Sequence, residues 1–155
     1  MSHLNNPAVR HDIVLMFDIA DGNPNGDPDS GNRPRVDPET GHGLVTDVSL
    51  KRKIRDTIGL ASNGSEGYSI FVTAGSALND TLERSYNETG TKLGKETKEA
   101  NSARAWLCRN YFDIRLFGGV LGTGNTPALG QIRGPLQVSF ARSIDPVTPA
   151  EHAIT

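Results

Sequence analysis

The order of apolar and polar positions divides the chain into short predicted elements separated by polar segments. The segment His11–Ala20 contains a nearly continuous apolar run, interrupted only by Asp18. Runs of this length that contain branched residues and lack helix caps are typical of strands buried on both faces. The pattern therefore predicts that His11–Ala20 is the central strand of a sheet.

A change to helical spacing follows at residues 43–59. One narrow apolar stripe is formed by Leu50, Ile54 and Ile58. Thr46 suits the N-cap position because its hydroxyl can accept a hydrogen bond from the first turn, and Gly59 suits the left-handed residue after a helix. We expect a helix over Asp47–Ile58, with its apolar stripe packed on the sheet.

The remaining apolar patterns are shorter and predict a mixed set of elements. Strands are predicted at Tyr68–Val72, Asp113–Phe117 and 131–142. Helices are predicted at Ser76–Glu88 and Ala100–Phe112. Trp106 and Cys108 are expected to serve packing. The polar segment Thr89–Glu99 is expected to be exposed and mobile in the absence of partners.

Two long segments consist largely of turn-forming residues. Asp21–Gly41 is rich in Asp, Asn, Gly and Pro and is predicted to form a long loop, mobile without partners, and not a regular element. Gly118–Gly130 is rich in glycine but lacks the spacing of a phosphate-binding loop. We expect the glycines of this second loop to let the backbone approach another surface closely.

Composition narrows the function classes. The chain has 155 residues, 22% of them charged, and a formal net charge of −2, which argues against a stand-alone nucleic-acid binder. The charge is uneven, because residues 1–40 carry seven acidic and three basic residues while residues 41–60 carry four basic and two acidic ones. The single cysteine fits a reducing cytoplasm, and no apolar run is long enough to span a membrane.

The basic residues gather on the predicted helix. Lys51 and Arg55 lie four residues apart at the edge of the apolar stripe, with Arg52 further round and Lys53 on the opposite side. Such a row suits a chain of phosphates. The alternative is a solvated helix face without a ligand, and the spacing alone favours neither interpretation.

Several long motifs, found in order along nearly the whole chain, resemble the backbone subunit of the type I-C CRISPR Cascade complex. The matching segments are 21–28, 34–47, 50–55, 112–118, 131–135 and 141–147. Residues 46–55 also resemble the helix start of other Cascade backbone proteins.

The resemblance implies an α+β fold. Its expected form is a ferredoxin-like, RNA-recognition-type palm with an antiparallel sheet and helical insertions. Residues 1–155 would form a single domain, with a finger-like insertion over about 60–112. Members of this family continue well past Glu151–Thr155. The chain therefore resembles their N-terminal half, and we expect the palm to be incomplete at the C-terminus.

The resemblance also implies a non-catalytic role. The expected partners are CRISPR RNA, copies of the same chain and other Cascade subunits, with target DNA reached through guide pairing. The implied RNA-binding residues are Lys51, Arg55, Arg52, Arg33, Arg35 and Arg133. No cofactor, catalytic residue, metal site or membrane association is expected.

Two alternatives rest on the acidic loop. Asp21, Asp27 and Asp29 lie where related backbone proteins of type III complexes carry an Asp for metal-dependent RNA cleavage. The same loop also matches most of a calcium-binding loop, but Asn32 stands where a bidentate Glu is expected. The remaining interpretation is a loop whose carboxylates cap its own turns.

Overall fold

The computed structural model describes residues 6, 8–90, 97–122 and 129–150. Within these residues the strands pair antiparallel, and the four α-helices follow one another in the sequence between β3 and β4. The predicted α+β class is therefore confirmed. In chain order the elements are β1 (Gly26–Asp27), the 3₁₀ helix η2 (Pro28–Ser30), β2 (Arg33–Pro34), β3 (His42–Val45), α1 (Asp47–Ser62), α2 (Leu78–Glu88), α3 (Thr97–Asn110), α4 (Phe112–Phe117), β4 (Gly118–Leu121), β5 (Gly130–Arg133) and β6 (Ala141–Pro146).

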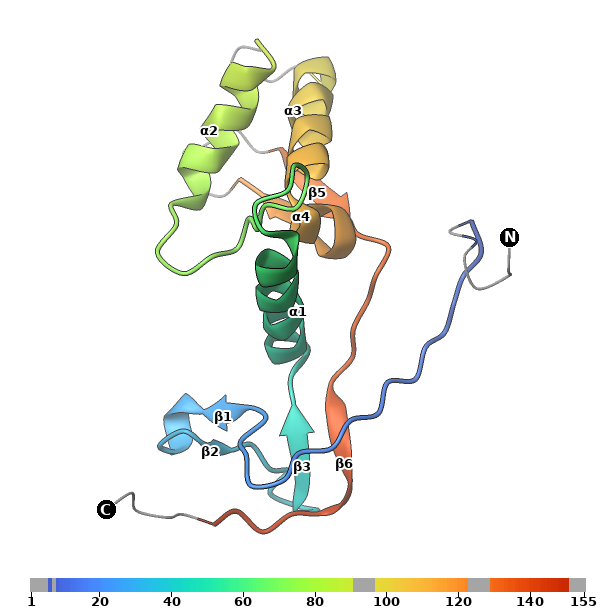
Figure 1. Ribbon diagram of the computed structural model, residues 1–155, viewed down its shortest axis with the longest axis vertical. Coiled ribbons are helices and arrows are strands. Elements are labelled where there is room, and N and C mark those ends of the chain that lie inside the picture. The colour runs from blue at the N-terminus through green and yellow to red at the C-terminus, as the bar shows by residue number, and fades with distance from the viewer. Residues whose placement is uncertain (1–5, 7, 91–96, 123–128, 151–155) are drawn as a thin grey trace.

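Figure 1 shows an elongated molecule in which α1 connects two regions. The helical region, residues 67–90, 97–122 and 129–134, contains α2, α3, α4 and the β4–β5 pair. The hairpin region, residues 23–45 and 141–147, contains β1, β2, β3 and β6. None of the helices in the described part of the chain is long and apolar enough to cross a membrane.

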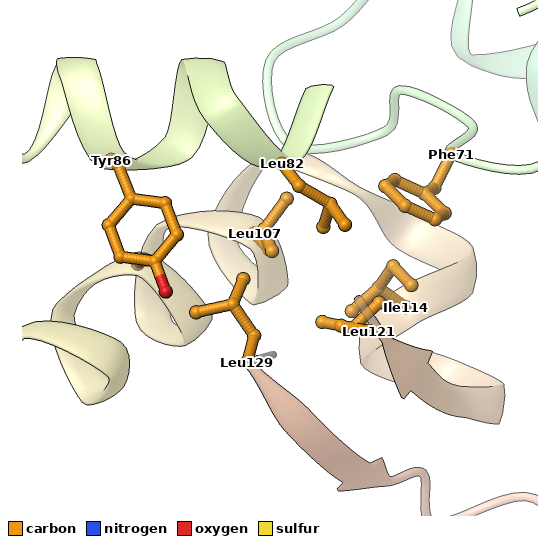
Figure 2. Close-up of a cluster of buried hydrophobic side chains, with 8 residues drawn as sticks. Phe71, Leu82, Tyr86, Leu107, Ile114, Leu121 and Leu129 are labelled. Atoms are coloured by element: carbon orange, nitrogen blue, oxygen red, sulfur yellow. The ribbon is translucent and has the colours of Figure 1, made fainter. Parts of the chain in front are cut away.

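The hydrophobic core lies in the helical region (Figure 2). It is formed by Phe71, Leu82, Tyr86, Ala103, Leu107, Ile114, Leu121 and Leu129. These side chains come from α2, α3, α4, β4 and the segments beside them, so the core joins elements distant in sequence. Trp106 and Cys108 are partly buried against this cluster, which confirms their predicted packing role.

The β4–β5 pair depends on a close backbone approach. Gly118 lies opposite Arg133 and adopts a left-handed conformation, with φ of 72°. A Cβ atom at Gly118 would collide with the carbonyl oxygen of Ile132. The predicted role for glycine in this segment is therefore confirmed at its first residue. Residues 123–128, the middle of that predicted loop, lie outside the described residues.

The predicted strand at Asp113–Phe117 is wrong, because this segment forms α4. Asp113, Ile114 and Phe117 are buried. Their spacing of one and four residues places them on one side of a helix, whereas a strand would turn successive residues to opposite faces. The segment is short enough that its apolar pattern fits either element, and packing on α3 selects the helix.

The hairpin region contains two short strand pairs, one of which lies inside the predicted loop Asp21–Gly41. β1 pairs with β2, with Gly26 opposite Pro34, and β3 pairs with β6, with Val45 opposite Ala141. The prediction that Asp21–Gly41 contains no regular element is therefore wrong over β1, η2 and β2. These elements are only two or three residues long, which is why the turn-rich composition concealed them.

The prediction of a central strand at His11–Ala20 is also wrong. This segment belongs to no sheet among the described residues, and its apolar side chains are exposed, with Val14 at 87% and Met16 at 80%. In Figure 1 the chain leading to β1 runs apart from the helical region and crosses β6 and β3 in the view before it reaches β1. An apolar run predicts a need for burial, but a strand also requires neighbouring strands, and the described residues supply none here.

Two other predicted strands are shortened or absent. Within 131–142 only the two ends pair, as β5 and the start of β6, and the residues between them form an extended connection. Tyr68–Val72 is not a strand, because its ladder is limited to one isolated bridge between Ser69 and Tyr111. Both segments have apolar residues but lack a continuous partner strand.

The helices are predicted better than the strands. α2 lies inside the predicted Ser76–Glu88, and α3 overlaps the predicted Ala100–Phe112 but begins at Thr97. The predicted mobile segment Thr89–Glu99 is therefore partly helical at its end, while its residues 91–96 lie outside the described residues.

The start of α1 is confirmed, and its end is corrected. Thr46 is the N-cap and accepts a hydrogen bond from the Ser49 backbone N–H. The helix passes through Gly59 and ends four residues later than predicted, with Asn63 in the left-handed conformation. The stripe residues Leu50, Ile54 and Ile58 are half-buried, but their predicted docking on a sheet centred on His11–Ala20 is wrong, because that segment belongs to no sheet among the described residues. The helix instead spans the space between the two regions (Figure 1).

Candidate nucleic-acid interface

The first predicted cation, Lys51, is held in place by two neighbours. Its Nζ lies 2.9 Å from the Asp47 carboxylate, one turn earlier in α1. It also lies 5.8 Å from the centre of the Phe117 ring at the end of α4. The Lys51 ammonium lowers the pKa of Asp47 by donating a hydrogen bond to its carboxylate. Lys51 is half-buried and therefore has less conformational freedom than a typical surface lysine.

Arg55 lies one turn further along α1 and is more deeply engaged. Its Nε donates to the Asp113 carboxylate at 2.8 Å, and its guanidinium lies 5.2 Å from the centre of the Phe117 ring. The Arg55 side chain is 13% exposed and that of Asp113 is 0% exposed. The structure thus gathers Lys51 and Arg55 around Phe117, and Arg55 is committed to an ion pair.

Asp113 was missed by sequence reasoning. Besides Arg55, it accepts hydrogen bonds from the backbone N–H groups of Phe71 at 2.8 Å and Val72 at 3.0 Å. Its side chain joins α4, the segment after α1 and α1 itself. The available signal was a single carboxylate between the apolar residues Phe112 and Ile114, because a buried acid requires partners.

The other two cations of the helix are exposed. Arg52 pairs with Asp56 at 2.8 Å, and both side chains are more than half exposed. Lys53 is exposed on another side of α1. Arg52 also borders an open groove of about 390 Å³ between α1 and the segment 70–73, lined mainly by Gly59, Leu60 and Ile70.

Arg33 and Arg35 lie in the hairpin region, away from Phe117. They border an open groove of about 480 Å³ that also includes Ser30. Arg35 lies 3.4 Å from Asp27, and its Nε is buried without a hydrogen-bond acceptor. Two cations facing one groove can accommodate an anionic group, although Asp27 offsets part of their charge.

Asn25 fixes the hairpin region to the start of α1. Its side-chain oxygen accepts hydrogen bonds from the Thr46 backbone N–H at 2.9 Å and from the Thr46 hydroxyl at 3.0 Å. The Ser49 hydroxyl reaches the carbonyl of Pro24 at 3.4 Å. The groove of Arg33 and Arg35 is therefore connected to the N-terminal end of α1, and sequence reasoning missed this connection as well.

Arg133 lies in β5 and is exposed. Its backbone is opposite Gly118, the residue after Phe117. Five of the six predicted cations thus form two groups, and Arg52, which lies between Lys51 and Arg55 in the sequence, belongs to neither. Lys51 and Arg55 lie around Phe117 with Arg133 on the adjoining strand, whereas Arg33 and Arg35 belong to the hairpin region. Arg52 is exposed and pairs with Asp56.

The carboxylates of the acidic loop cap its own turns. Asp27 accepts a hydrogen bond from the Asp29 backbone N–H at 3.2 Å, and Asp37 accepts one from that of Glu39 at 3.0 Å. Asp37 also pairs with Arg142 of β6 at 2.6 Å. These contacts confirm the interpretation of the loop as a series of capped turns. Within the described residues, no group of three or more His, Cys, Asp or Glu side chains is placed to hold a metal ion.

Comparison with known proteins gives two matches. Residues 9–155 match the family model described as CRISPR-associated protein Cas7. A protein of Haloferax volcanii, named CRISPR-associated protein Cas7, is 31% identical over 114 residues, which cover 72% of this chain and 32% of that protein. The chain therefore spans about a third of the length of this relative.

Proposed function

The chain belongs to the CRISPR-associated Cas7 family, and from this membership we propose that it is a non-catalytic, RNA-binding backbone subunit of a type I-C Cascade complex. In this role several copies lie along a CRISPR RNA, contact other Cascade subunits, and reach target DNA through pairing of the guide. Sequence specificity then belongs to the guide, and the protein recognises the RNA backbone.

The observation that carries the proposal is the fixed basic face of α1, defined as Lys51, Arg52 and Arg55. Lys51 is held by Asp47 and Phe117, so little side-chain freedom remains to be lost when a phosphate binds. Backbone phosphates are the natural ligands of such a face, because they are evenly spaced and identical in every sequence.

Three further cations extend the proposed RNA path. Arg133 lies on the strand next to Phe117, and Arg33 and Arg35 border the hairpin groove. The net charge of −2 means that attraction to RNA has to come from such local groups and not from the chain as a whole.

The direct test is the salt dependence of RNA binding. Each phosphate neutralised on single-stranded nucleic acid adds about −0.7 to the slope of log K against log salt concentration. Lys51→Ala combined with Arg52→Ala should therefore flatten the slope by about 1.4, equally for RNAs of different sequence. The measurement is fluorescence anisotropy of a labelled single-stranded RNA over a series of salt concentrations.

Lys53→Ala is the matched control, because it removes one positive charge from another side of the same helix. It should leave the salt slope unchanged. An equal loss of affinity in Lys53→Ala and Lys51→Ala would contradict the assigned face. If Lys51→Ala and Lys53→Ala both bind RNA as the wild type does, the result would favour the alternative in which this helix face is solvated and has no ligand.

The non-catalytic part of the proposal has its own test. RNA incubated with the protein and Mg²⁺ should remain intact on a denaturing gel. Asp27 is the acidic-loop residue to change, because a cleavage site would require its carboxylate as a metal ligand. Magnesium-dependent cleavage that disappears in Asp27→Ala would replace the non-catalytic role with that of an RNase.

A further inference from the structure

The attachment of α1 to the helical region includes specific polar contacts. No residue of α1, all of which are described, is fully buried, and the side chains of its apolar stripe, Leu50, Ile54 and Ile58, are half-buried. The specific contacts from this helix to α4 are made by Lys51 and Arg55, with Phe117 and Asp113. These contacts determine which way the basic face points.

Asp113 distributes its two carboxylate oxygens among three donors. Oδ1 accepts the Phe71 backbone N–H, and Oδ2 accepts both the Val72 N–H and the Arg55 Nε–H. A carboxylate can do this because both oxygens are acceptors only. An asparagine amide would present a donor to one of these N–H groups, so the isosteric Asn cannot reproduce the arrangement.

We propose that Asp113 is the positioning residue for the basic face of α1, and that Arg55 acts as its strut and not as a phosphate ligand. Arg55 is seated between the Asp113 carboxylate and the Phe117 ring, and its charge is paired inside the protein. Lys51 stands one turn earlier over the same ring, so a shift of Arg55 moves Lys51 as well. The part of this inference that concerns RNA rests on the proposed function.

The structural part can be tested without RNA. In the 155-residue chain the Arg55 Nε–H signal should be resolved and slow to exchange by NMR, because it is hydrogen-bonded and 13% exposed. Asp113→Asn should abolish this protection and speed exchange at the Phe71 and Val72 amides. An unchanged Arg55 signal in Asp113→Asn would overturn the proposal.

Asp56→Asn is the matched control. It breaks an arginine–carboxylate pair on the same helix, but that pair is exposed, with side chains 54% and 56% accessible. The Arg55 signal should be the same in Asp56→Asn as in the wild type. Loss of the signal in both variants would show that any change in helix charge releases Arg55, which contradicts a specific role for Asp113.

The RNA-binding part separates a strut from a ligand. Arg55→Lys keeps the positive charge but lacks the planar fork that fits Asp113. A strut predicts that Arg55→Lys weakens binding of a labelled single-stranded RNA as much as Arg55→Met does, several-fold, because neither side chain can hold the basic face in place. It also predicts that Asp113→Asn combined with Arg55→Met is no weaker than the weaker single variant.

A phosphate ligand predicts a different pattern. Arg55→Lys would then bind like the wild type, because it keeps the positive charge. Asp113→Asn would strengthen binding, because it would release the Arg55 charge. Either result overturns the strut. If Asp113→Asn does not fold, the two Arg55 variants still decide between a strut and a ligand.

Failure of the proposed function looks different again. A wild-type chain that binds no RNA, but whose Arg55 Nε–H is protected and depends on Asp113, would refute RNA binding. The positioning role of Asp113 would stand. Unprotected Arg55 in a chain that binds RNA with the predicted salt slope would refute the positioning role alone.

Discussion

The two regions joined by α1 are held together by different forces. The helical region has a dry core in which Leu107 and Leu129 are fully buried. In the hairpin region the one fully buried apolar side chain among the described residues is Val45. Its other long-range ties are polar, such as the Asn25–Thr46 hydrogen bonds and the Arg142–Asp37 ion pair.

This difference determines how each region responds to its surroundings. Apolar burial depends little on pH or salt, whereas exposed ion pairs weaken when either partner is neutralised or screened. The basic face of α1 lies between the two kinds of structure. Asn25 secures its first turn from the hairpin side, and Asp113 secures Arg55 from the core side. The orientation of this face therefore depends on polar contacts at both ends.

The largest expected effect comes from the Arg55–Asp113 ion pair, which is buried against the core. Asp113→Ala leaves the Arg55 guanidinium and the Phe71 and Val72 N–H groups without their acceptor. Removing one partner of a buried pair costs about 3–5 kcal/mol of unfolding free energy. Denaturant unfolding followed by circular dichroism measures this change. The control Asp56→Ala should change stability by less than about 0.5 kcal/mol.

The next largest effect is expected from truncating a side chain in the hydrophobic core of the helical region. Leu107→Ala removes a fully buried side chain and leaves a cavity between α2, α3 and β4, which costs about 2–5 kcal/mol. The unfolding midpoint in denaturant should fall accordingly. Leu60→Ala is the control, because Leu60 is 83% exposed and its truncation leaves no cavity. Equal effects of the two changes would mean that the core is not packed as described.

Local signals in the sequence predicted the parts of the structure that depend on local contacts. Thr46 caps α1 through Ser49, three residues away, and this contact was predicted. The Arg55–Asp113 pair spans 58 residues and could not be predicted from spacing. The sequence therefore suggested the cations of the candidate site, whose contact with RNA stays a prediction, but it did not suggest Asp113, which pairs with Arg55.

The misplaced strands have a common physical cause. His11–Ala20 shows that apolar side chains alone do not make a strand, because its backbone also needs a neighbouring ladder. Asp113–Phe117 shows the reverse case, in which an apolar segment has a partner but packs as a helix. In both cases the tertiary context determines which element forms. The apolar pattern of so short a segment carries too little information to reveal that context.

A smaller effect is expected where the hairpin region joins α1. Asn25→Ala removes the acceptor for the Thr46 N–H and hydroxyl, which are part-buried, and costs about 1–3 kcal/mol. The loss should be local, so amide exchange should speed up in β3 and the first turn of α1 while the helical region stays protected. Asn87→Ala, on the exposed face of α2, is the control. Faster exchange throughout the helical region would show that the two regions are not independent.

The smallest effect concerns the exposed pair between Asp37 and Arg142. The hydrogen bond from Arg142, with further donation from the Glu39 backbone, lowers the pKa of Asp37 from its ordinary 3.8 to about 2. A pKa lower in the folded than in the unfolded protein means that folding favours the charged carboxylate. The stabilisation is therefore complete above about pH 4 and is lost as the pH falls toward 2.

Comparison of the wild type with Asp37→Asn isolates this contribution from the other carboxylates that titrate in acid. Amide exchange in β3 and β6 should be faster in Asp37→Asn than in the wild type at pH 6, because residue 37 no longer carries the negative charge that pairs with Arg142. The difference between the two proteins should shrink as the pH falls from 4 toward 2, since protonation then neutralises the wild-type carboxylate as well. The core amides around Leu107 should show no such difference at any pH. If the difference in exchange rate between the two proteins instead grows as the pH falls, the sign of the linkage is the opposite of the one expected. The Asp37–Arg142 pair would then not be the contact that makes the hairpin region sensitive to acid.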